Sequence, residues 1–191
     1  MRSETEQKLN RIWYGDEAPP FALRALAPLY RSVHALNRWL GIRRRPRDLE
    51  QAYIIVVGNL TAGGSGKTPL VVRLCRLLTQ AGFNPGVVSR GYGRDGRDLR
   101  LVGQGSDPRQ VGDEPLLIAR RAGVPVVVAA ERCEAVRRLL ERGVDVIVAD
   151  DGLQHYRLPR DLEICVVDGS RVFGNGRLLP AGPLREPVER L

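Results

Sequence analysis

Long apolar runs and aromatic residues are scarce in this sequence, and each shortage argues against a class of protein. No apolar run approaches the roughly 20 residues that a membrane-spanning helix needs, and the polar start of the chain is unlike a secretory signal. Aromatic residues make up 5% of the 191 residues and basic residues are spread along the chain, which argues against a nucleic-acid binder in spite of a net charge of +8. With 43% hydrophobic residues, we expect a globular protein with a buried core.

Cysteine and lysine are also rare. Cys75, Cys133 and Cys165 lie in apolar segments without metal-ligand spacing, so we expect buried free thiols in a reducing compartment. Lys8 and Lys67 are the only lysines among 30 basic residues, and the rest are arginines. A lysine is therefore informative here, and Lys67 stands where a compact ammonium group on a flexible stem is the usual requirement.

Residues 1–50 are predicted to form a basic amphipathic helical segment. Arg24, Arg31 and Arg38 recur on one helical face, and Pro28 is expected to kink or split the helix. The opposite face is apolar at helical spacing and comprises Leu26, Leu29, Tyr30, Val33, Leu36 and Leu40. Two interpretations stay open: a helix lying in a membrane interface, or a helix packed on its own domain with a solvated basic face.

Strand and helix signals alternate from residue 51 onward. Strands are predicted at 53–57, 86–89, 125–129, 144–149 and 162–167, and helices at 69–81, 113–122 and 131–142. Because the strands are continuous apolar runs, we expect a mainly parallel sheet covered by helices on both faces, an α/β fold like that of P-loop NTPases. Residues 94–108 are expected to form a loop or small hairpin. The predicted domain is 51–170, and 171–191 is expected to be a loop leading to a further C-terminal lobe.

The strongest motif is GNLTAGGSGKT, residues 58–68, between a predicted strand and a predicted helix. Glycines let backbone N–H groups converge on phosphate oxygens, and the helix N-terminus adds its positive dipole end. Lys67 is expected to reach the nucleotide phosphates, and the Thr68 hydroxyl to bind Mg²⁺. Thr61 stands where the standard pattern has glycine. The predicted nucleotide-binding residues are Thr61, Ala62, Gly63, Gly64, Ser65, Gly66, Lys67 and Thr68.

Acidic residues follow in VDVIVADD, residues 144–151, and GDEP, residues 112–115. An apolar strand that ends in aspartate is typical of a Walker B site, so one of Asp150 and Asp151 is predicted to support Mg²⁺ while the other serves another ligand. The alternative is a strand that simply ends at an acidic turn. The acids of GDEP either stabilise a helix N-terminus electrostatically or supply a base. The segment SRGYGR, residues 89–94, either contacts a phosphorylated acceptor or forms a polar turn.

Taken in order, GNLTAGGSGKTP, VSRGYGR, VGDEP, ADDGLQH and LPAGPLREP resemble the tetraacyldisaccharide 4'-kinase family. That family phosphorylates the 4'-hydroxyl of the tetraacyldisaccharide 1-phosphate lipid A precursor from ATP. The resemblance runs from the N-terminal helix to the last residue. It implies ATP and Mg²⁺ as cofactors, and it favours the interfacial interpretation of the N-terminal helix.

The resemblance also implies roles for particular residues. Asp113 would activate the acceptor hydroxyl, and Thr68, Glu114 and Asp150 would hold the metal. The residues implied to contact the substrate are Arg90, Tyr92, Asp151, His155, Arg185 and Glu186. The protein would lie peripherally on the cytoplasmic face of the inner membrane, with a lipid disaccharide as its partner and no nucleic acid. The sequence does not reveal the oligomeric state, and a monomer is favoured.

One part of the family's site is missing from this sequence, and a rival interpretation stays open. The family carries a C-terminal lobe whose histidine pairs with the catalytic aspartate, and neither His34 nor His155 can be that residue, so we expect weak nucleotide binding and poor phosphate transfer from these residues alone. The rival interpretation is a P-loop GTPase or metal-insertion ATPase that acts as a switch. The N-K-x-D motif typical of guanine recognition is not found in this sequence.

Overall fold

The chain folds into two units, each built from segments that are distant in the sequence. The structure is a computed structural model that describes residues 4–49, 52–64 and 66–191. Unit 1 comprises Met1–Leu40, Asn59–Ser65 and Cys165–Leu191, and unit 2 comprises Gly41–Gly58 and Gly66–Ile164. The domains expected from the sequence, 1–50, 51–170 and 171–191, stay a prediction.

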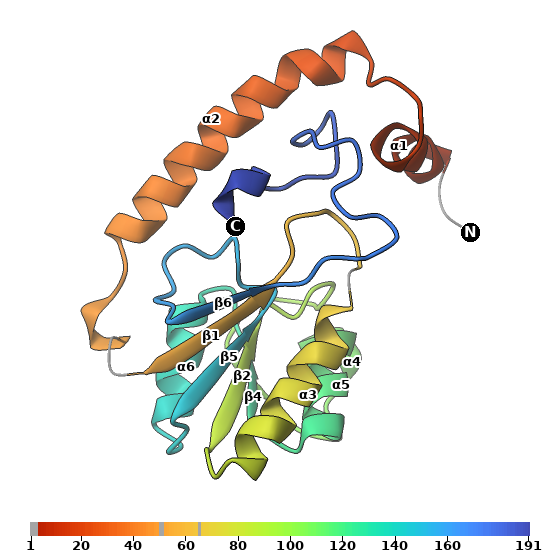
Figure 1. Cartoon of the computed structure of the whole chain (residues 1–191). Helices are drawn as coiled ribbons and strands as arrows, with labels where there is room; N and C mark the ends of the chain where they lie inside the picture. Colours follow the sequence, from red (N-terminus) through yellow and green to blue (C-terminus); the bar gives the residue numbers. More distant parts are fainter. Residues whose placement is uncertain (1–3, 50–51, 65) are drawn as a thin grey trace. The chain divides into compact units, whose positions relative to one another are not determined.

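Unit 2 is built on the sheet. The strands are β1 (Tyr53–Gly58), β2 (Pro85–Ser89), β3 (Arg100–Val102), β4 (Val126–Val128), β5 (Val146–Asp150) and β6 (Leu162–Cys165). Their order is β3-β4-β2-β5-β1-β6 (Figure 1). The pairs β1–β5, β2–β5 and β2–β4 are parallel, whereas β3–β4 is antiparallel. The predicted mainly parallel α/β sheet is therefore confirmed.

Helices cover both faces of this sheet. Helices α3 (Lys67–Gln80) and α5 (Asp113–Ala122) pack on one face, and α6 (Arg132–Leu140) packs on the other (Figure 1). A one-turn helix, α4 (Pro108–Val111), precedes α5. Every residue of β2, β4 and β5 is buried, as expected for parallel strands between two helical layers.

Two sequence predictions need correction at the edges of the sheet. Residues 94–108 are not merely a loop or a hairpin, because β3 lies within them and pairs with β4; its three residues are too few to give a strand signal. The strand predicted at 162–167 ends at Cys165 and is not covered on both faces, since Leu162 is 45% exposed. The reason is that β6 is an edge strand with β1 as its neighbour.

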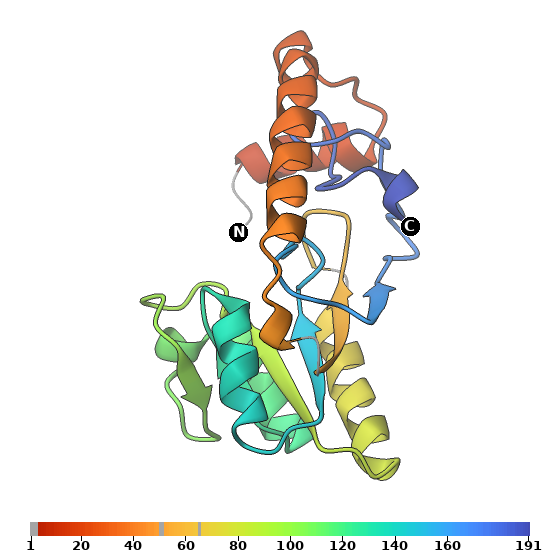
Figure 2. The same cartoon turned by 90° about the vertical axis from the view of Figure 1, so that its left-hand side faces the viewer.

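Unit 1 combines helix α1 (Glu4–Tyr14) and helix α2 (Phe21–Arg43) as far as Leu40 with the irregular C-terminal segment. That segment ends in a short 3₁₀ turn, Val188–Arg190 (Figure 2). Side-chain hydrogen bonds fix the C-terminal segment to α1. The Trp13 indole donates to the Pro180 carbonyl at 3.2 Å, and the Asn175 amide donates to the carbonyls of Ile12 and Ala181, both at 3.0 Å. A second 3₁₀ turn, Arg47–Leu49, lies in unit 2.

Helix α2 is continuous, so of the two alternatives expected at Pro28 the split is wrong and the kink stays a prediction. Proline removes one N–H group, and the flanking turns continue the helix around it. The apolar face is largely exposed, from 48% at Leu26 to 61% at Leu29. Two members of the predicted apolar face, Tyr30 and Leu40, are half-buried, and so is His34. Over the described residues, no helix combines the length and the apolarity that crossing a membrane requires.

Candidate nucleotide and acceptor site

The glycine-rich loop leads directly into the N-terminus of α3. Gly66 is the N-cap residue and adopts a left-handed conformation with φ 77°, which side-chain-bearing residues rarely tolerate. No side chain caps this helix end. The first-turn N–H groups of α3 are therefore available to an anion, and the helix dipole favours one there. Ser65, predicted to bind nucleotide, lies outside the described residues.

The preceding part of the loop belongs to unit 1, where it pairs with the LPAGPLREP segment. The backbone N–H of Ala62 donates to the Pro183 carbonyl at 2.8 Å, and that of Arg185 donates to the Leu60 carbonyl at 2.6 Å. Within the loop, the Asn59 amide donates to the Thr61 carbonyl at 2.7 Å. The first and last of the sequence motifs therefore meet in unit 1.

Asp150 ends β5 as a buried carboxylate with only part of its hydrogen-bonding capacity used. Its side chain is 1% exposed, and one oxygen accepts from the Ser89 hydroxyl at 3.2 Å. The other oxygen, Oδ1, has no hydrogen-bond partner among the described residues. Burial raises the pKa of Asp150 to about 6, with the neighbouring Glu114 and Asp151 carboxylates adding to the effect. A buried acceptor without a partner is costly, and a bound cation would satisfy it.

Asp151 differs from its neighbour in backbone and surroundings. Its φ is 50°, an uncommon left-handed value for a residue other than glycine, and such values concentrate at functional sites. Its carboxylate lies 3.4 Å from the Lys67 ammonium. The turn is fixed because the Gly152 N–H donates to the Val57 carbonyl at 3.1 Å, which joins the ends of β5 and β1.

Two glycines bring the SRGYGR and GDEP segments into contact. A Cβ on Gly112 would lie 3.0 Å from the Cα of Gly91, and both glycines have positive φ. Asp113 and Glu114 follow at the first turn of α5, with exposed side chains. The helix dipole stabilises acids at this position. The close backbone approach therefore places both acids next to the SRGYGR turn.

A cavity of about 490 Å³ lies beside this turn. Its charged and aromatic lining residues are Arg90, Tyr92, Arg94, Arg97, Arg132 and His155. Tyr92 is 88% exposed, so its ring is free to contact a ligand. Neither aspartate nor glutamate is among the described residues that line the cavity, so its chemistry suits an anion.

Arg132 is a cavity residue that the sequence reasoning missed. It is 6% exposed, its Nη2 donates to the Asp151 carbonyl at 3.4 Å, and its Nε lacks a hydrogen-bond partner among the described residues. Burial lowers the pKa of its guanidinium. The available signal was a cation directly after an apolar strand, at the start of a helix, which is where parallel α/β sheets bind ligands.

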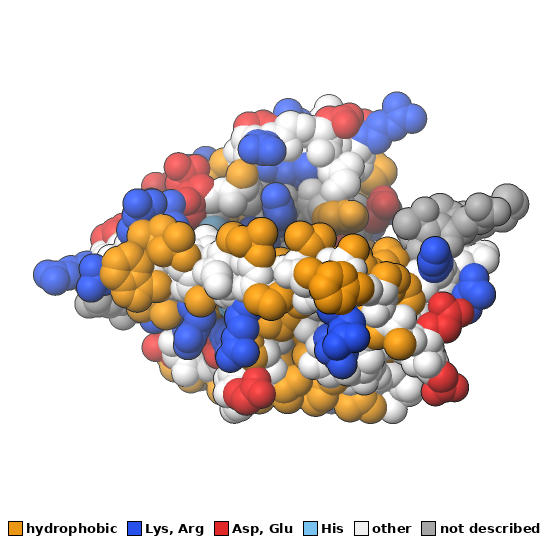
Figure 3. All heavy atoms as spheres, turned by 90° about the horizontal axis from the view of Figure 1, so that it is seen from above, with side chains coloured by type: hydrophobic (Ala, Val, Ile, Leu, Met, Phe, Trp, Pro, Cys, Tyr) orange, Lys and Arg blue, Asp and Glu red, His pale blue; other side chains and the backbone are white. Residues whose placement is uncertain are grey.

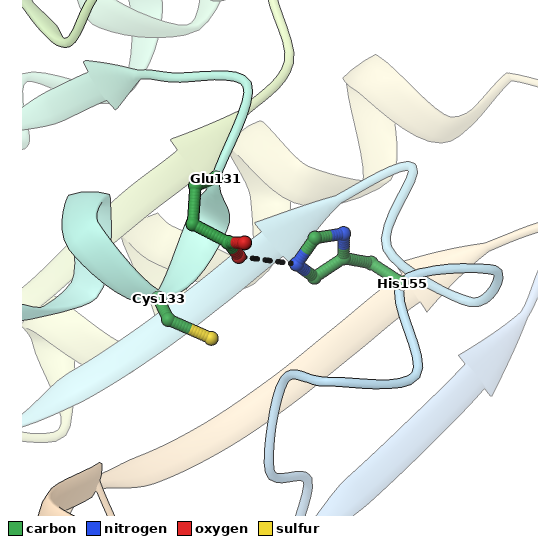
Figure 4. A group of neighbouring side chains, drawn as sticks. All are labelled: Glu131, Cys133 and His155. Atoms are coloured by element: carbon green, nitrogen blue, oxygen red, sulfur yellow. Dashed lines mark hydrogen bonds and ion pairs between the residues drawn. The ribbon is translucent and has the colours of Figure 1, made fainter. Parts of the chain in front are cut away.

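His155 also lines the cavity and has a carboxylate partner. Its Nε2 lies 3.2 Å from Oε1 of Glu131 (Figure 4). Burial and, next in size, the Arg132 charge lower the pKa of His155 to about 4, so the ring is neutral at pH 7. The Arg160 guanidinium donates to the His155 carbonyl at 2.7 Å and fixes this part of the loop.

The predicted site residues thus fall into two groups. Unit 2 holds Lys67, Thr68, Arg90, Tyr92, Asp113, Glu114, Asp150, Asp151 and His155, as well as Gly66. Unit 1 holds Thr61, Ala62, Gly63, Gly64, Arg185 and Glu186. The Glu186 carboxylate is buried and forms an ion pair with Arg190 at 2.5 Å.

Strand β1 leads through a glycine-rich turn into a helix that begins with Lys67 and Thr68, and its parallel neighbour β5 ends in a buried aspartate. This arrangement defines a P-loop nucleotide-binding protein. Residues 20–191 match the family model of tetraacyldisaccharide-1-P 4'-kinase, and the chain belongs to that family.

Curated relatives agree with this placement. The chain is 54% identical over 184 residues to a tetraacyldisaccharide 4'-kinase of Stenotrophomonas maltophilia, covering 93% of this chain and 53% of the relative. A protein of the same name from Xanthomonas euvesicatoria is 53% identical over 182 residues, covering 93% and 52%. The chain therefore spans about half the length of the curated relatives it matches.

A solved structure is also similar. The crystal structure of LpxK from Aquifex aeolicus in complex with ATP matches with a TM-score of 0.74 and 32% identity, covering 88% of this chain and 54% of that chain. This likeness supports both the fold and the family.

Proposed function

We propose that this chain supplies the nucleotide- and acceptor-binding residues of an ATP-dependent kinase that phosphorylates the 4'-hydroxyl of tetraacyldisaccharide 1-phosphate, the lipid A precursor. The observation that carries the proposal is the pairing of an uncapped helix N-terminus at Lys67 with a buried aspartate, Asp150, at the end of a neighbouring strand. Family membership and the names of the relatives support the reaction and the acceptor.

The residues of unit 2 fit ATP and Mg²⁺. Lys67 would leave Asp151 to reach the terminal phosphates, while the N–H groups that open α3 donate to phosphate oxygens. Thr68, Glu114 and Asp150 would hold Mg²⁺, and the unpartnered oxygen of Asp150 is the observation that fits a cation. When bound, Mg²⁺ neutralises charge on the phosphates. Thr61 to Gly64 precede these residues in the chain and keep their predicted role in nucleotide binding.

Asp113 is proposed as the base for the acceptor hydroxyl. It is exposed at the first turn of α5, beside the SRGYGR turn and its cavity. Arg90, Arg132 and Tyr92 would hold the anionic sugar part of the acceptor, because the cavity that they line is cationic. Arg185 and Glu186 keep their predicted contact with the acceptor.

Helix α2 is proposed to lie in the surface of the membrane that contains the acceptor, on its cytoplasmic face. Orange apolar side chains form a row over α2, with blue basic side chains beside them (Figure 3). Leu29 and Val33 are about 60% exposed, which is unusual for large apolar residues unless a partner or lipid covers them. Arg24, Arg31 and Arg38 would face anionic headgroups.

The test is transfer of labelled γ-phosphate from ATP to the lipid disaccharide. We expect Mg²⁺-dependent transfer that is efficient in a full-length relative, poor in this chain alone and lost in Asp113→Asn, whereas ATP binding is kept in that variant. Because the chain spans about half of its relatives, transfer is measured with the chain and with a full-length relative carrying the matching substitution. Binding of GTP in preference to ATP would overturn the kinase proposal in favour of a GTPase switch.

A further inference from the structure

Glu131, Cys133 and His155 form a compact group of metal-ligating side chains next to the cavity (Figure 4). One donor atom from each residue lies within 4.8 Å of the other two. Glu131 is the N-cap residue of α6, Cys133 lies in the first turn of that helix, and His155 comes from the loop after β5. The fold therefore brings together three donors that the sequence spacing did not reveal.

The distances suit a small tetrahedral ion. Zinc binds thiolate sulfur at about 2.3 Å and imidazole nitrogen or carboxylate oxygen at about 2.1 Å, so donor atoms in such a site lie roughly 3.3–3.8 Å apart. His155 Nε2 and Glu131 Oε1 are already 3.2 Å apart. Only small side-chain rotations would bring the Cys133 sulfur to a bonding distance, given the 4.8 Å limit on the present separations.

The surroundings hold these donors in place. Arg157 forms an ion pair with the second oxygen of Glu131, which leaves Oε1 directed at His155. The Cys133 thiol lies 3.8 Å from the Arg157 carbonyl, and the Arg160 guanidinium fixes the His155 backbone. Partners of this kind orient metal ligands and are typical of structured metal sites.

The group adjoins the cavity through His155, whereas Glu131 is half-buried and the Cys133 side chain is 1% exposed. His155 lines the cavity of about 490 Å³, and so does Arg132, which stands between Glu131 and Cys133 in the sequence. Three protein ligands leave a fourth tetrahedral position for water or an anion. One thiolate, one carboxylate and one neutral imidazole would balance a divalent ion, so the complex itself would be neutral.

We infer that Glu131, Cys133 and His155 form a binding site for a borderline-soft divalent cation of the Zn²⁺ type, separate from the proposed Mg²⁺ site. Sulfur and nitrogen donors favour Zn²⁺ and Co²⁺, whereas Mg²⁺ selects oxygen donors. Binding releases the thiol proton of Cys133 and replaces the contact between His155 and Glu131 by two metal–ligand bonds.

One consequence rests on the proposed function. A bound Zn²⁺ ion occupies Nε2 of His155 and so withholds this residue from the acceptor. Zn²⁺ would then compete with the lipid disaccharide without changing the binding of Mg-ATP.

The test uses Co²⁺ as the probe, added to the reduced chain in the presence of excess Mg²⁺. We expect one equivalent to bind, with a thiolate-to-cobalt charge-transfer band in the near ultraviolet that Zn²⁺ abolishes. Cys133→Ser removes the band, and Cys165→Ser, the matched control, keeps it. His155→Gln weakens Co²⁺ binding at least about tenfold, and His34→Gln, its control, does not.

Folding of the variants is checked by thermal unfolding without metal. Glu131→Gln, at a half-buried position, provides a further ligand variant should Cys133→Ser be unstable. No charge-transfer band from the parent chain, or an unchanged band from Cys133→Ser, would overturn the inference. The assay contains neither nucleotide nor acceptor, so its failure leaves the kinase proposal intact. Conversely, Lys67→Ala should bind Co²⁺ normally.

Discussion

The strand ends of unit 2 and the helices of unit 1 differ in the kind of group that lacks its usual environment. At the strand ends, polar groups are buried without full partners, as at Asp150 and Arg132. In unit 1, the backbone of the C-terminal segment is tied down by hydrogen bonds, while α2 leaves large apolar side chains exposed. The first pattern is typical of a site that binds charged ligands, and the second of a surface that binds an apolar partner or lipid.

We therefore expect substitutions at the strand ends to change mainly the binding of charged ligands, and some of them to stabilise the fold. In unit 1, we expect some substitutions to lower the stability of the fold and others to weaken only the attachment to a membrane.

The largest effect is expected from Asp150→Asn. Removing the carboxylate should weaken Mg²⁺-dependent ATP binding at least about hundredfold, roughly 3 kcal/mol, which titration calorimetry would measure. If the variant bound Mg-ATP with parental affinity, the buried Asp150 carboxylate would have no role in ligand binding, which would contradict the comparison of the two units.

The same variant makes a prediction about stability in metal-free solution. The pKa of Asp150 is raised from 3.8 to about 6 in the folded protein, so the folded chain binds more protons than the unfolded chain between these values, and its stability falls as pH rises through that window. Asparagine does not titrate. Asp150→Asn should therefore gain about 3 kcal/mol over the parent above pH 6 and nothing below pH 4, measured by urea unfolding at both pH values.

Reversing the basic face of α2 comes next in size. Arg24, Arg31 and Arg38 changed together to glutamate should release the chain from anionic vesicles, because each basic residue near such a surface contributes about 1 kcal/mol. Vesicle sedimentation measures the effect, with thermal unfolding expected to stay unchanged. The charge-matched control in unit 2 replaces Arg73, Arg76 and Arg121 by glutamate. Equal loss of vesicle binding in both variants would show that α2 contributes only through its net charge.

Gly112→Ala should lower stability by about 2–3 kcal/mol, since alanine there combines a strained positive φ with a contact of 3.0 Å to the Gly91 backbone. Gly123→Ala is the control for a left-handed backbone: its φ is 69° and its ψ 21°, whereas Gly112 has a ψ of 151°. The space around the added methyl group is open, so about 1 kcal/mol is expected. Denaturant unfolding of the pair measures the backbone contact together with the more strained backbone of Gly112. Equal losses would show that this contact does not hold the two segments together.

The smallest effect is expected from Asn175→Ala. Its amide donates to two carbonyls of unit 1 and accepts from the Arg177 N–H at 3.1 Å. Losing these partly exposed bonds should cost about 1–2 kcal/mol without changing Mg-ATP affinity. Unfolding curves and nucleotide titration on the same sample give both values. A large loss of nucleotide affinity would contradict the separation of roles between the two units.

Much of unit 2 could be predicted from the sequence because its signals are local. A continuous apolar run followed by GGSGKT or ADD specifies a strand and the chemistry at its end, and α5 begins and ends where its pattern predicts. Strand β3 was missed because an antiparallel edge strand of three residues owes its existence to β4 and not to its own sequence.

The parts of the site that escaped prediction depend on tertiary contacts. Arg132 reads as one more arginine in an arginine-rich chain, and only its burial beside Asp151 distinguishes it. Cys133 lies in the first turn of α6 and His155 in the loop after β5, so no spacing rule links them. The C-terminal segment lacks periodicity because side-chain bonds such as that of Trp13 replace regular secondary structure there.

The most direct test of the account is Mg-ATP binding by Lys67→Ala, beside Lys8→Ala, which removes the only other lysine from an exposed position on α1. We predict that Lys67→Ala binds Mg-ATP at least about hundredfold more weakly than the parent and that Lys8→Ala binds it equally well. Equal affinity for all three proteins would contradict the assignment of this loop to the nucleotide phosphates.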